Sequence, residues 1–386
     1  MRDFRGSGSR RTRRQAQSRG GPALGMKICL ALITWAMSSA CGQDWRSAIP
    51  GWQYQFPRDH HHHPEFKIEW WYFTGNLFDQ TGRRFGFELT FFREGVIPPS
   101  QRMPGRSRFI VDDLKFAHFT ITDANARRFQ FIQKTNRGTF AEAGFDRGGN
   151  IAWIENWSLK LNSAGEFRLS ATTGKANLEL TMVPESAPVI HGTDGVSVKG
   201  SGENHASHYY SFPRLMTQGA IQTAGHPFNV TGLSWFDHEW ATNQLAPNQV
   251  GWNWLCVQFA NRTELMLYQM RLDNGTIDPA SSGTFIDSNG KATHLTSQNF
   301  AMTPVARWKS EKTGADYPVE WRIEIPSREL TFTVRPILRD QELALAPLTY
   351  WEGAIDAIGN VRENEIRGAG YLELTGYAGS LGEPTR

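Results

Sequence analysis

Short apolar runs separated by tight polar turns fill most of this chain. In residues 69–93, EWWYFTGNLFDQTGRRFGFELTFFR, the turn Asp79–Gly82 separates an apolar run from one that is largely of period two. Comparable hairpins are predicted within residues 108–135, 153–184 and 319–338. No amphipathic helix is indicated beyond short pieces such as residues 139–145. We therefore expect an all-β protein made of sandwiches or barrels, without βαβ units.

The first hairpin has a counterpart in the second half of the chain. Residues 251–275, GWNWLCVQFANRTELMLYQMRLDNG, match it with Trp252 on Trp70 and Trp254 on Tyr72. A second echo pairs residues 209–240 with the closing residues 349–377. The same order in both halves predicts an internal duplication with its boundary near residues 243–249. We expect an N-terminal β-domain at residues 41–243 and a C-terminal β-domain at residues 244–386.

The first 40 residues have the pattern of an extension followed by a signal peptide. Residues 1–25 hold seven Arg and one Asp, and Lys27 precedes the apolar run ICLALITWAM and the small residues before Cys41. Cleavage before Cys41 would expose a residue that can carry lipid, so we expect an exported protein, periplasmic or lipid-anchored. Cys256 is then the single internal cysteine, and its apolar strand predicts a buried thiol.

The net charge of +3 comes from the N-terminus. Subtracting +6 for residues 1–25 and +1 for Lys27 leaves −4 for residues 28–386. A mildly acidic body has no basic stripe to neutralise phosphates, so we expect no nucleic-acid partner.

The segment LSWFDHEWATNQL, residues 233–245, carries the main catalytic candidates. Strand alternation places Asp237 and Glu239 on one face and His238 on the other. Two close carboxyl groups beside Trp235 are the arrangement that raises one pKa towards neutrality. In the alternative reading the acids face outward and pair with Arg or Lys. Setting Gly232 on Gly370 in the repeat matches Asp237, His238 and Glu239 with Thr375, Gly376 and Tyr377, so the second copy lacks the charged triad.

Aromatic residues gather at several other points of the sequence. Such rings can wall a pocket for a long apolar ligand, although for any single ring ordinary packing of a β-domain interface is the better explanation. The candidate ligand-binding residues are Glu69, Trp70, Trp71, Tyr72, Tyr209, Tyr210, Trp240, Trp252 and Trp254.

The run His60–His63 invites a metal interpretation. Adjacent residues of a strand face opposite ways, and no neighbouring Cys, His or Asp completes a tetrahedral set, so we expect a loop without a catalytic metal. Walker A, Rossmann, G-x-S-x-G and H-E-x-x-H motifs do not occur either. The sequence therefore indicates no cofactor.

Several segments in this order resemble the AttH-like lipocalin-type family, which includes the carotenoid 1,2-hydratases: HPEFKIEWWYFTGNL, YYSFPRL, VTGLSWFDHEW, GWNWLCVQF and GAGYLELTGY. The resemblance covers residues 51–382 and implies two tandem lipocalin-like β-barrel domains. Hydratases of this family add water to an acyclic carotenoid without a cofactor. Matched by motif, their site implies His238, Trp240 and Tyr268, with Asp237 beside them.

These observations lead to one hypothesis and one rival. The first is an exported double lipocalin-like protein that binds a hydrophobic isoprenoid- or lipid-like molecule. As an enzyme it would be a cofactor-independent hydro-lyase, in which Asp237 or Glu239 protonates an alkene and His238 or Tyr268 orients the water. The rival is a non-catalytic carrier, periplasmic or a lipoprotein, that passes a lipid-like ligand to an ABC exporter.

Overall fold

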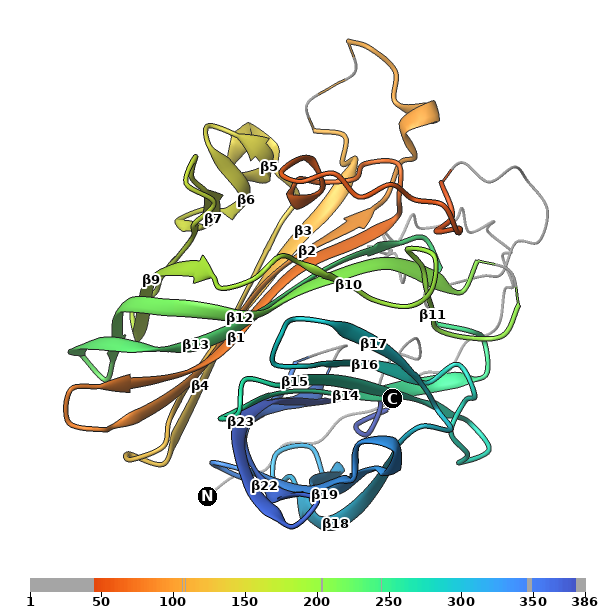
Figure 1. The fold of residues 1–386 in the computed structure, drawn as a ribbon. Coiled ribbons are helices and arrows are strands. Elements are labelled where there is room, and N and C mark those ends of the chain that lie inside the picture. The colour runs from red at the N-terminus through yellow and green to blue at the C-terminus, as the bar shows by residue number, and fades with distance from the viewer. Residues whose placement is uncertain are drawn as a thin grey trace, which may run out of the picture. The chain divides into compact units, whose positions relative to one another are not determined.

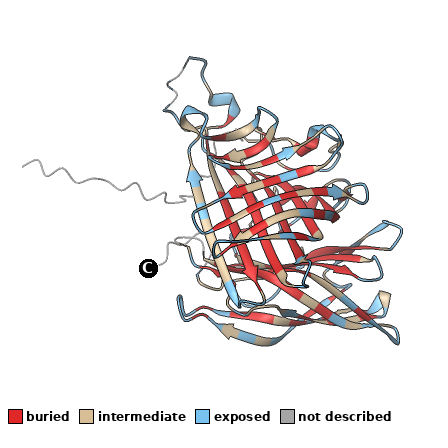
Figure 2. Ribbon diagram, turned by 90° about the vertical axis from the view of Figure 1, so that its left-hand side faces the viewer, coloured by how far each residue is buried: buried red, intermediate tan, exposed pale blue. Residues whose placement is uncertain are grey.

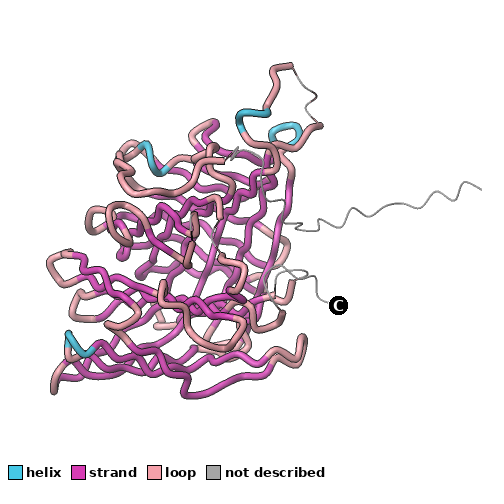
Figure 3. Tube along the Cα trace, turned by 90° about the vertical axis from the view of Figure 1, so that its right-hand side faces the viewer, coloured by secondary structure: helices cyan, strands magenta, loops and turns pink. Residues whose placement is uncertain are grey.

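A computed structural model describes residues 45–379 except residues 106, 108, 203, 244 and 346–348. Strands make up nearly all of its regular structure, and the helical segments are single turns in loops (Figure 3). These 3-10 turns are η1 (Arg58–His60), η2 (Pro99–Gln101), η3 (Thr139–Ala141) and η4 (Pro326–Arg328). Among the described residues, no helix has the length and apolar character needed to cross a bilayer. The predicted all-β class is confirmed, whereas the predicted leader and Cys41 lie outside the described residues.

The first sheet has 13 strands and is drawn in red to green in Figure 1. Its strands are β1 (Ile68–Asp79), β2 (Arg84–Gly95), β3 (Asp113–Asp123), β4 (Arg128–Asn136), β5 (Ala143–Arg147), β6 (Asn150–Ile154), β7 (Trp157–Leu161), β8 (Phe167–Thr172), β9 (Ala176–Pro184), β10 (Val189–Ile190), β11 (Ser197–Val198), β12 (Ala206–Thr223) and β13 (His226–Ala241). They follow the order β4-β3-β2-β1-β13-β12-β9-β8-β7-β6-β5, with β10 and β11 paired to β12. The sheet curls until β6 contacts β3 and β4, which nearly closes a barrel.

The second sheet has 10 strands and lies below the first in Figure 1. Its strands are β14 (Gln249–Phe259), β15 (Glu264–Leu272), β16 (Ser282–Ile286), β17 (Ala292–Thr296), β18 (Ala301–Lys309), β19 (Asp316–Ile325), β20 (Leu330–Pro336), β21 (Glu342–Leu343), β22 (Tyr350–Val361) and β23 (Asn364–Leu374). They follow the order β17-β16-β15-β14-β23-β22-β20-β19-β18, with β21 paired to β22. In each sheet the first strand pairs with the last strand of the same half. This shared order supports the duplication and the double lipocalin-like fold.

The strand registers correct the sequence match within the repeat. Tyr72 stands opposite Asp237 in the first sheet, and Trp254 stands opposite Glu373 in the second. Because Tyr72 corresponds to Trp254, the counterpart of Asp237 is Glu373 and not Thr375. The second copy therefore keeps an acid at this position. The sequence match had set the counterpart of Asp237 two residues too far towards the C-terminus.

The two faces of β1 and β13 serve different environments. Trp71, Phe73, Phe236 and Trp240 belong to the core of the first barrel, and the second barrel has its own core around Trp351. Buried residues concentrate along the central strands, whereas loops and hairpin ends are exposed (Figure 2). This separation is the one expected from the pleat of a strand, in which neighbouring side chains point to opposite faces.

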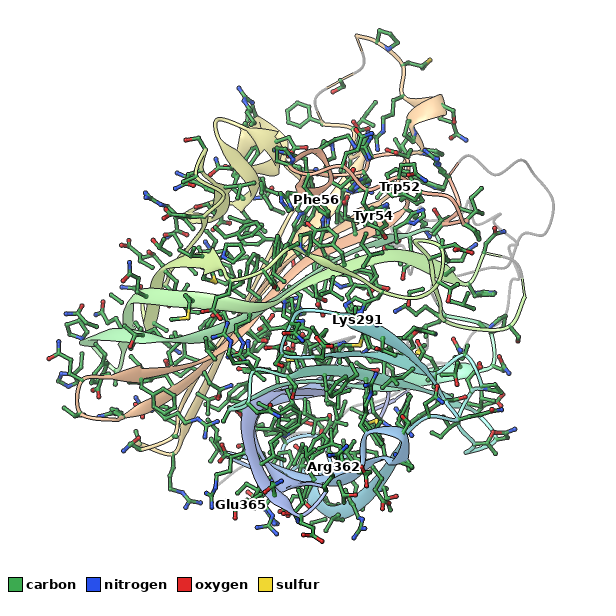
Figure 4. The ribbon with its side chains drawn as sticks, in the orientation of Figure 1. Trp52, Tyr54, Phe56, Lys291, Arg362 and Glu365 are labelled. Carbon is green, nitrogen blue, oxygen red and sulfur yellow. The ribbon has the colours of Figure 1, made fainter. Side chains whose placement is uncertain are left out.

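The N-terminal segment covers part of the first barrel. Trp52, Tyr54 and Phe56 lie close together on this segment (Figure 4). The rings of Trp52 and Tyr54 are each 5.8 Å from the Trp240 ring, and Phe56 is 4.9 Å from Tyr210. Aromatic side chains from a loop thus shield the interior residues from water.

The short helical piece suggested at residues 139–145 is limited to one turn. Phe140 has a positive φ of 58° inside η3, and Ala143 already begins β5. The predicted helix does not extend further because residues from Ala143 onward pair with β6 instead, and an isolated helical turn is only marginally stable.

The opposite face of β1, β12 and β13 packs against the second barrel. A third apolar cluster joins Tyr72, Tyr209 and Trp235 to Trp254 and Cys256. Cys256 is buried and unpaired, as the sequence predicts. Hydrogen bonds cross the same interface, which lies within one compact unit spanning residues 42–386.

Candidate active site between the barrels

A cavity of about 220 Å³ lies where the two barrels meet. Its wall comes from β1, β2, β3, β12 and β13 of the first barrel and from β14, β15, β22 and β23 of the second. It is rich in aromatic rings and carboxyl groups, which are Trp70, Tyr72, Phe92, Phe116, Tyr209, Trp252, Trp254, Tyr268, Tyr350, Glu69, Glu94, Asp237, Glu239, Glu352 and Glu373. Apolar walls with a few converging polar groups are typical of small-molecule sites.

Asp237 is held at this cavity by three hydrogen-bond donors of the first barrel. Its oxygens accept hydrogen bonds from Tyr209 Oη at 2.7 Å, from Trp235 Nε1 at 2.6 Å and from the Ser211 hydroxyl. Burial raises the pKa of Asp237 to about 7, although the three donors favour the charged form and oppose that rise. Asp237 can therefore both give and take a proton near neutral pH.

Glu239 has a different environment on the same strand face. Its Oε1 lies 3.1 Å from Lys199 Nζ, and both side chains are at most 6% exposed. The Lys199 ammonium also stands over the rings of Tyr268 and Tyr209, at 4.1 and 4.7 Å from their centroids. Glu239 is thus part of a buried ion pair, which leaves Asp237 as the acid-base group on this side.

Tyr268 borders the cavity from the second barrel. Its hydroxyl donates to the main-chain oxygen of Val198 at 3.0 Å and receives a hydrogen bond from Ser282 at 2.7 Å. The contact with Val198 fixes the ring against the first barrel, and the contact with Ser282 fixes it within the second, so Tyr268 shapes the wall beneath Lys199.

The second barrel adds two carboxyl groups that sequence reasoning missed, Glu352 and Glu373. Burial raises the pKa of Glu352 well above its usual value, and the nearby charges of Glu88 and Glu373 add to the effect. Removal from bulk water also raises the pKa of Glu373 to about 8, opposed by a hydrogen bond from Trp252 and assisted by the charges of Asp237 and Glu239. The signal that could have found Glu373 was the correct register of the repeat.

The sequence candidates divide between the two faces of the first sheet. The cavity brings together Asp237, Glu239 and Tyr268, with the rings of Trp70, Tyr72, Tyr209, Trp252 and Trp254. The other candidates, His238, Trp71, Tyr210 and Trp240, lie instead among the buried groups of the first barrel. Glu69 borders the cavity, but its carboxylate bonds residues of the barrel interior.

His238 belongs to a charged network inside the first barrel. Its Nε2 lies 3.0 Å from Glu69 Oε1, and its Nδ1 lies 3.0 Å from the main-chain oxygen of Asp59. Glu69 also accepts from His63 Nδ1 at 2.7 Å and from Arg93 Nε at 3.3 Å. Burial lowers the pKa of His63, but the charges of Glu69 and Asp59 outweigh it and raise that pKa to about 9.

This network contains the residues that could hold a metal ion. The ligand atoms of His63, Glu69 and His238 lie within 4.8 Å of one another. They would offer two nitrogens and one oxygen, a set that suits zinc or iron, in competition with the proton on His63 and with Arg93. Sequence spacing missed this grouping because His238 comes from a distant strand.

The four consecutive histidines do not converge on one common partner. His60 Nδ1 lies 2.7 Å from the Tyr210 hydroxyl, and His61 and His62 both bond Asp146. His63 alone joins the Glu69 network. The run therefore does not act as one ligand set.

A wider hollow of about 450 Å³ lies at the far hairpin ends of the first sheet, lined by Arg83, Asp123 and Arg128 among others. Arg83 is already paired with Asp123 there. Its lining also includes Arg128 and His226, but its one carboxyl group, that of Asp123, is held by Arg83. The cavity between the barrels, which gathers several buried carboxyl groups, is therefore the better candidate.

The AttH-like family model matches residues 47–377. A crystal structure described as AttH, from Nitrosomonas europaea, superposes with a TM-score of 0.77 at 32% identity, covering 86% of this chain and 99% of that chain. Kievitone hydratase from Nectria haematococca superposes with a TM-score of 0.67 at 14% identity, covering 84% and 93%, which shows the shared fold alone. The dehydratase asqC from Emericella nidulans is 21% identical over 272 residues, 66% of this chain and 75% of that protein. The match over most of the chain, together with the two joined lipocalin-like barrels, shows that this protein belongs to the AttH-like family.

Proposed function

We propose that this protein is a hydro-lyase that adds water to, or removes it from, a hydrophobic molecule held in the cavity between its barrels. The observation that carries the proposal is Asp237, a buried carboxyl group with a near-neutral pKa at an aromatic wall. A group in that state suits proton transfer to and from a bound substrate. The names of two relatives, a hydratase and a dehydratase, point in the same direction.

The cavity itself supports an apolar substrate. Trp70, Trp252 and Trp254 present large ring surfaces around Asp237. Its volume of about 220 Å³ is below the roughly 300–1,000 Å³ of most ligand sites. The space therefore suits a compact molecule or the reacting end of a longer one.

The surroundings of Asp237 define its part in the reaction. Tyr209, Ser211 and Trp235 aim three donors at its oxygens, so they stabilise the carboxylate after it gives up a proton. Because these donors come from neighbouring strands of one sheet, they hold the carboxyl group in place before substrate binds.

Conversion in water enriched in the heavy oxygen isotope tests this function. The purified full chain is incubated with a lipid extract of its own cells, and species that gain or lose the elements of water are identified by mass spectrometry. We expect one apolar species to react, and Asp237→Asn to lower its rate by about 10²–10⁴-fold while leaving that species bound in native mass spectrometry. Asp287→Asn, in an exposed turn, is the matched control and should retain the rate.

Two results would overturn the proposal. One is an apolar molecule that copurifies and never changes mass, as a carrier would give. The other is conversion that persists in Asp237→Asn.

A further inference from the structure

Carboxyl groups from both barrels face one cavity. Asp237 lies on β13 of the first barrel, and Glu373 lies at the corresponding position of β23 in the second. Each stands opposite an aromatic residue of the adjoining strand, Tyr72 for Asp237 and Trp254 for Glu373. The duplication has thus brought two equivalent acids to the two sides of a single site.

An aromatic pair connects these two sides. Tyr209 Oη donates to Asp237 Oδ2 at 2.7 Å and accepts from Trp254 Nε1 at 3.2 Å. Trp254 is in turn the register partner of Glu373. The contact between Tyr209 and Trp254 therefore fixes the position of one acid-bearing strand pair relative to the other.

Resting on the proposed function, we propose that Glu373 is the second catalytic residue and exchanges a proton with the substrate oxygen while Asp237 exchanges one with the substrate carbon. The site would then need both barrels, which explains why the cavity lies between them.

The two carboxyl groups differ in their hydrogen-bond donors, and this difference assigns their roles. Asp237 accepts from Tyr209, Ser211 and Trp235, which favours its charged, proton-accepting form. Glu373 has the Trp252 ring as its donor, and the neighbouring acids disfavour a further negative charge on it. Asp237 is therefore the base in the dehydration direction, and Glu373 is the acid.

The proton and electron balance needs no further reactant. In dehydration, the Asp237 carboxylate takes a proton from carbon, and the electron pair of that C–H bond forms the double bond. The adjacent C–O bond breaks, and its oxygen leaves as water after taking the proton of Glu373. Afterwards Asp237 carries the proton and Glu373 is ionised, so proton transfer from one to the other restores the starting state. Hydration is the reverse sequence.

This chemistry limits the class of substrate. A carboxylate with a near-neutral pKa removes a proton from carbon only when a neighbouring group stabilises the charge left behind. A carbonyl group next to that carbon provides this stabilisation. This chemistry favours an apolar β-hydroxy carbonyl compound and its conjugated enone over an isolated alkene.

Several titratable groups surround Glu373 and enter the pH dependence. They are Asp237 and Glu239 on β13, Glu88 on β2, Glu352 and Tyr350 on β22, and Tyr72 on β1. Glu88 makes a matched control, because burial also raises its pKa to about 8 while its side chain is absent from the cavity wall.

The test measures initial rates against pH for the wild type, Glu373→Gln, Glu373→Asp and Glu88→Gln, with the same lipid extract in heavy-oxygen water. The wild-type rate should fall through about pH 8 as Glu373 ionises. Glu373→Gln should lower the rate by about 10²-fold or more, and Glu373→Asp should recover part of it. Glu88→Gln should keep the rate at the optimum, and the fall should move to lower pH, because loss of the Glu88 charge makes the ionisation of Glu373 easier.

The outcomes separate this inference from the proposed function. Loss of conversion in Asp237→Asn with full activity in Glu373→Gln would overturn the role of Glu373 and leave the hydro-lyase standing. Equal losses in Glu373→Gln and Glu88→Gln, with both variants folded by circular dichroism, would show a structural effect and also overturn it. A reacting species that has no carbonyl group would overturn the substrate class. Conversion retained in Asp237→Asn would remove the function itself.

Discussion

The carboxylate of Glu69 connects His63, His238 and Arg93 inside the first barrel, and its side chain is fully buried. A buried charge of this kind costs free energy to desolvate, and its partners recover that cost through hydrogen bonds of good geometry. The network lies directly beneath β13, the strand that carries Asp237. Neighbouring residues of β13 thus have different roles: His238 belongs to the buried charged network, and Asp237 is the proposed proton-transfer group.

Replacing Glu69 tests the cost of leaving those partners unpaired. We expect Glu69→Gln to lower the free energy of unfolding by about 3–5 kcal/mol, because Arg93 then lacks its counter-charge and His63 keeps only that of Asp59. Urea unfolding at neutral pH measures this change in the free energy of unfolding. Glu365→Gln, on the outer part of the second barrel (Figure 4), breaks an ion pair whose glutamate is 59% exposed and should change stability by less than about 1 kcal/mol. Equal effects of the two substitutions would contradict a buried network.

At the scale of elements, the pairing of β14 with β23 places Glu373 in the cavity. Gly370 lies opposite Val257 in this pair, and a Cβ atom there would come within 1.8 Å of the Cys256 main-chain oxygen. The close approach of the two backbones leaves no room for a side chain. The glycine therefore protects the register on which the position of Glu373 depends.

Gly370→Ala should displace β23 from β14. We expect a loss of stability above about 2 kcal/mol, as for other overpacked sites, together with loss of conversion in the lipid-extract assay. Gly174→Ala, at a position where a Cβ would meet nothing within 4 Å, is the control and should be neutral or slightly stabilising. Chemical denaturation of both variants decides the point, and a tolerated Gly370→Ala would contradict the tight strand pairing.

At the scale of the whole molecule, the two barrels share an apolar interface in addition to their separate cores. Residues 42–386 form one compact unit, and an apolar cluster with Trp235 and Trp254 spans the two sheets. Between the barrels, Asn76 Nδ2 donates to the Gly370 main-chain oxygen at 3.1 Å, and Gln258 Nε2 donates to that of Pro213 at 2.7 Å. Separating the barrels would expose aromatic surface and these polar groups at once.

We therefore expect one cooperative thermal transition for the two barrels together. Differential scanning calorimetry should give a calorimetric enthalpy close to the van't Hoff enthalpy, because neither barrel can unfold without uncovering the shared cluster. Two resolved transitions would show instead that the interface contributes little stability.

Much of the fold followed from the sequence, because it depends on local rules. The hairpins, the repeat and the opposite orientation of Asp237 and His238 all come from turn residues and the two-residue period of a strand. The match of Asp237 to Thr375 was wrong because similarity along the chain does not fix strand register. Export of the protein, which the seven N-terminal Arg and the apolar run near Cys41 indicate, stays a prediction.

The composition of the site was decided by the tertiary structure. The pairing of Glu239 with Lys199, the meeting of His63 with His238 and the approach of Glu373 to Asp237 all join segments distant in the chain. The two-residue period of a strand predicts that neighbouring side chains point to opposite faces, but it does not predict which strand packs against each face. The packing of one barrel on the other determines these neighbours, and it brings Asp237 and Glu373 into one candidate site.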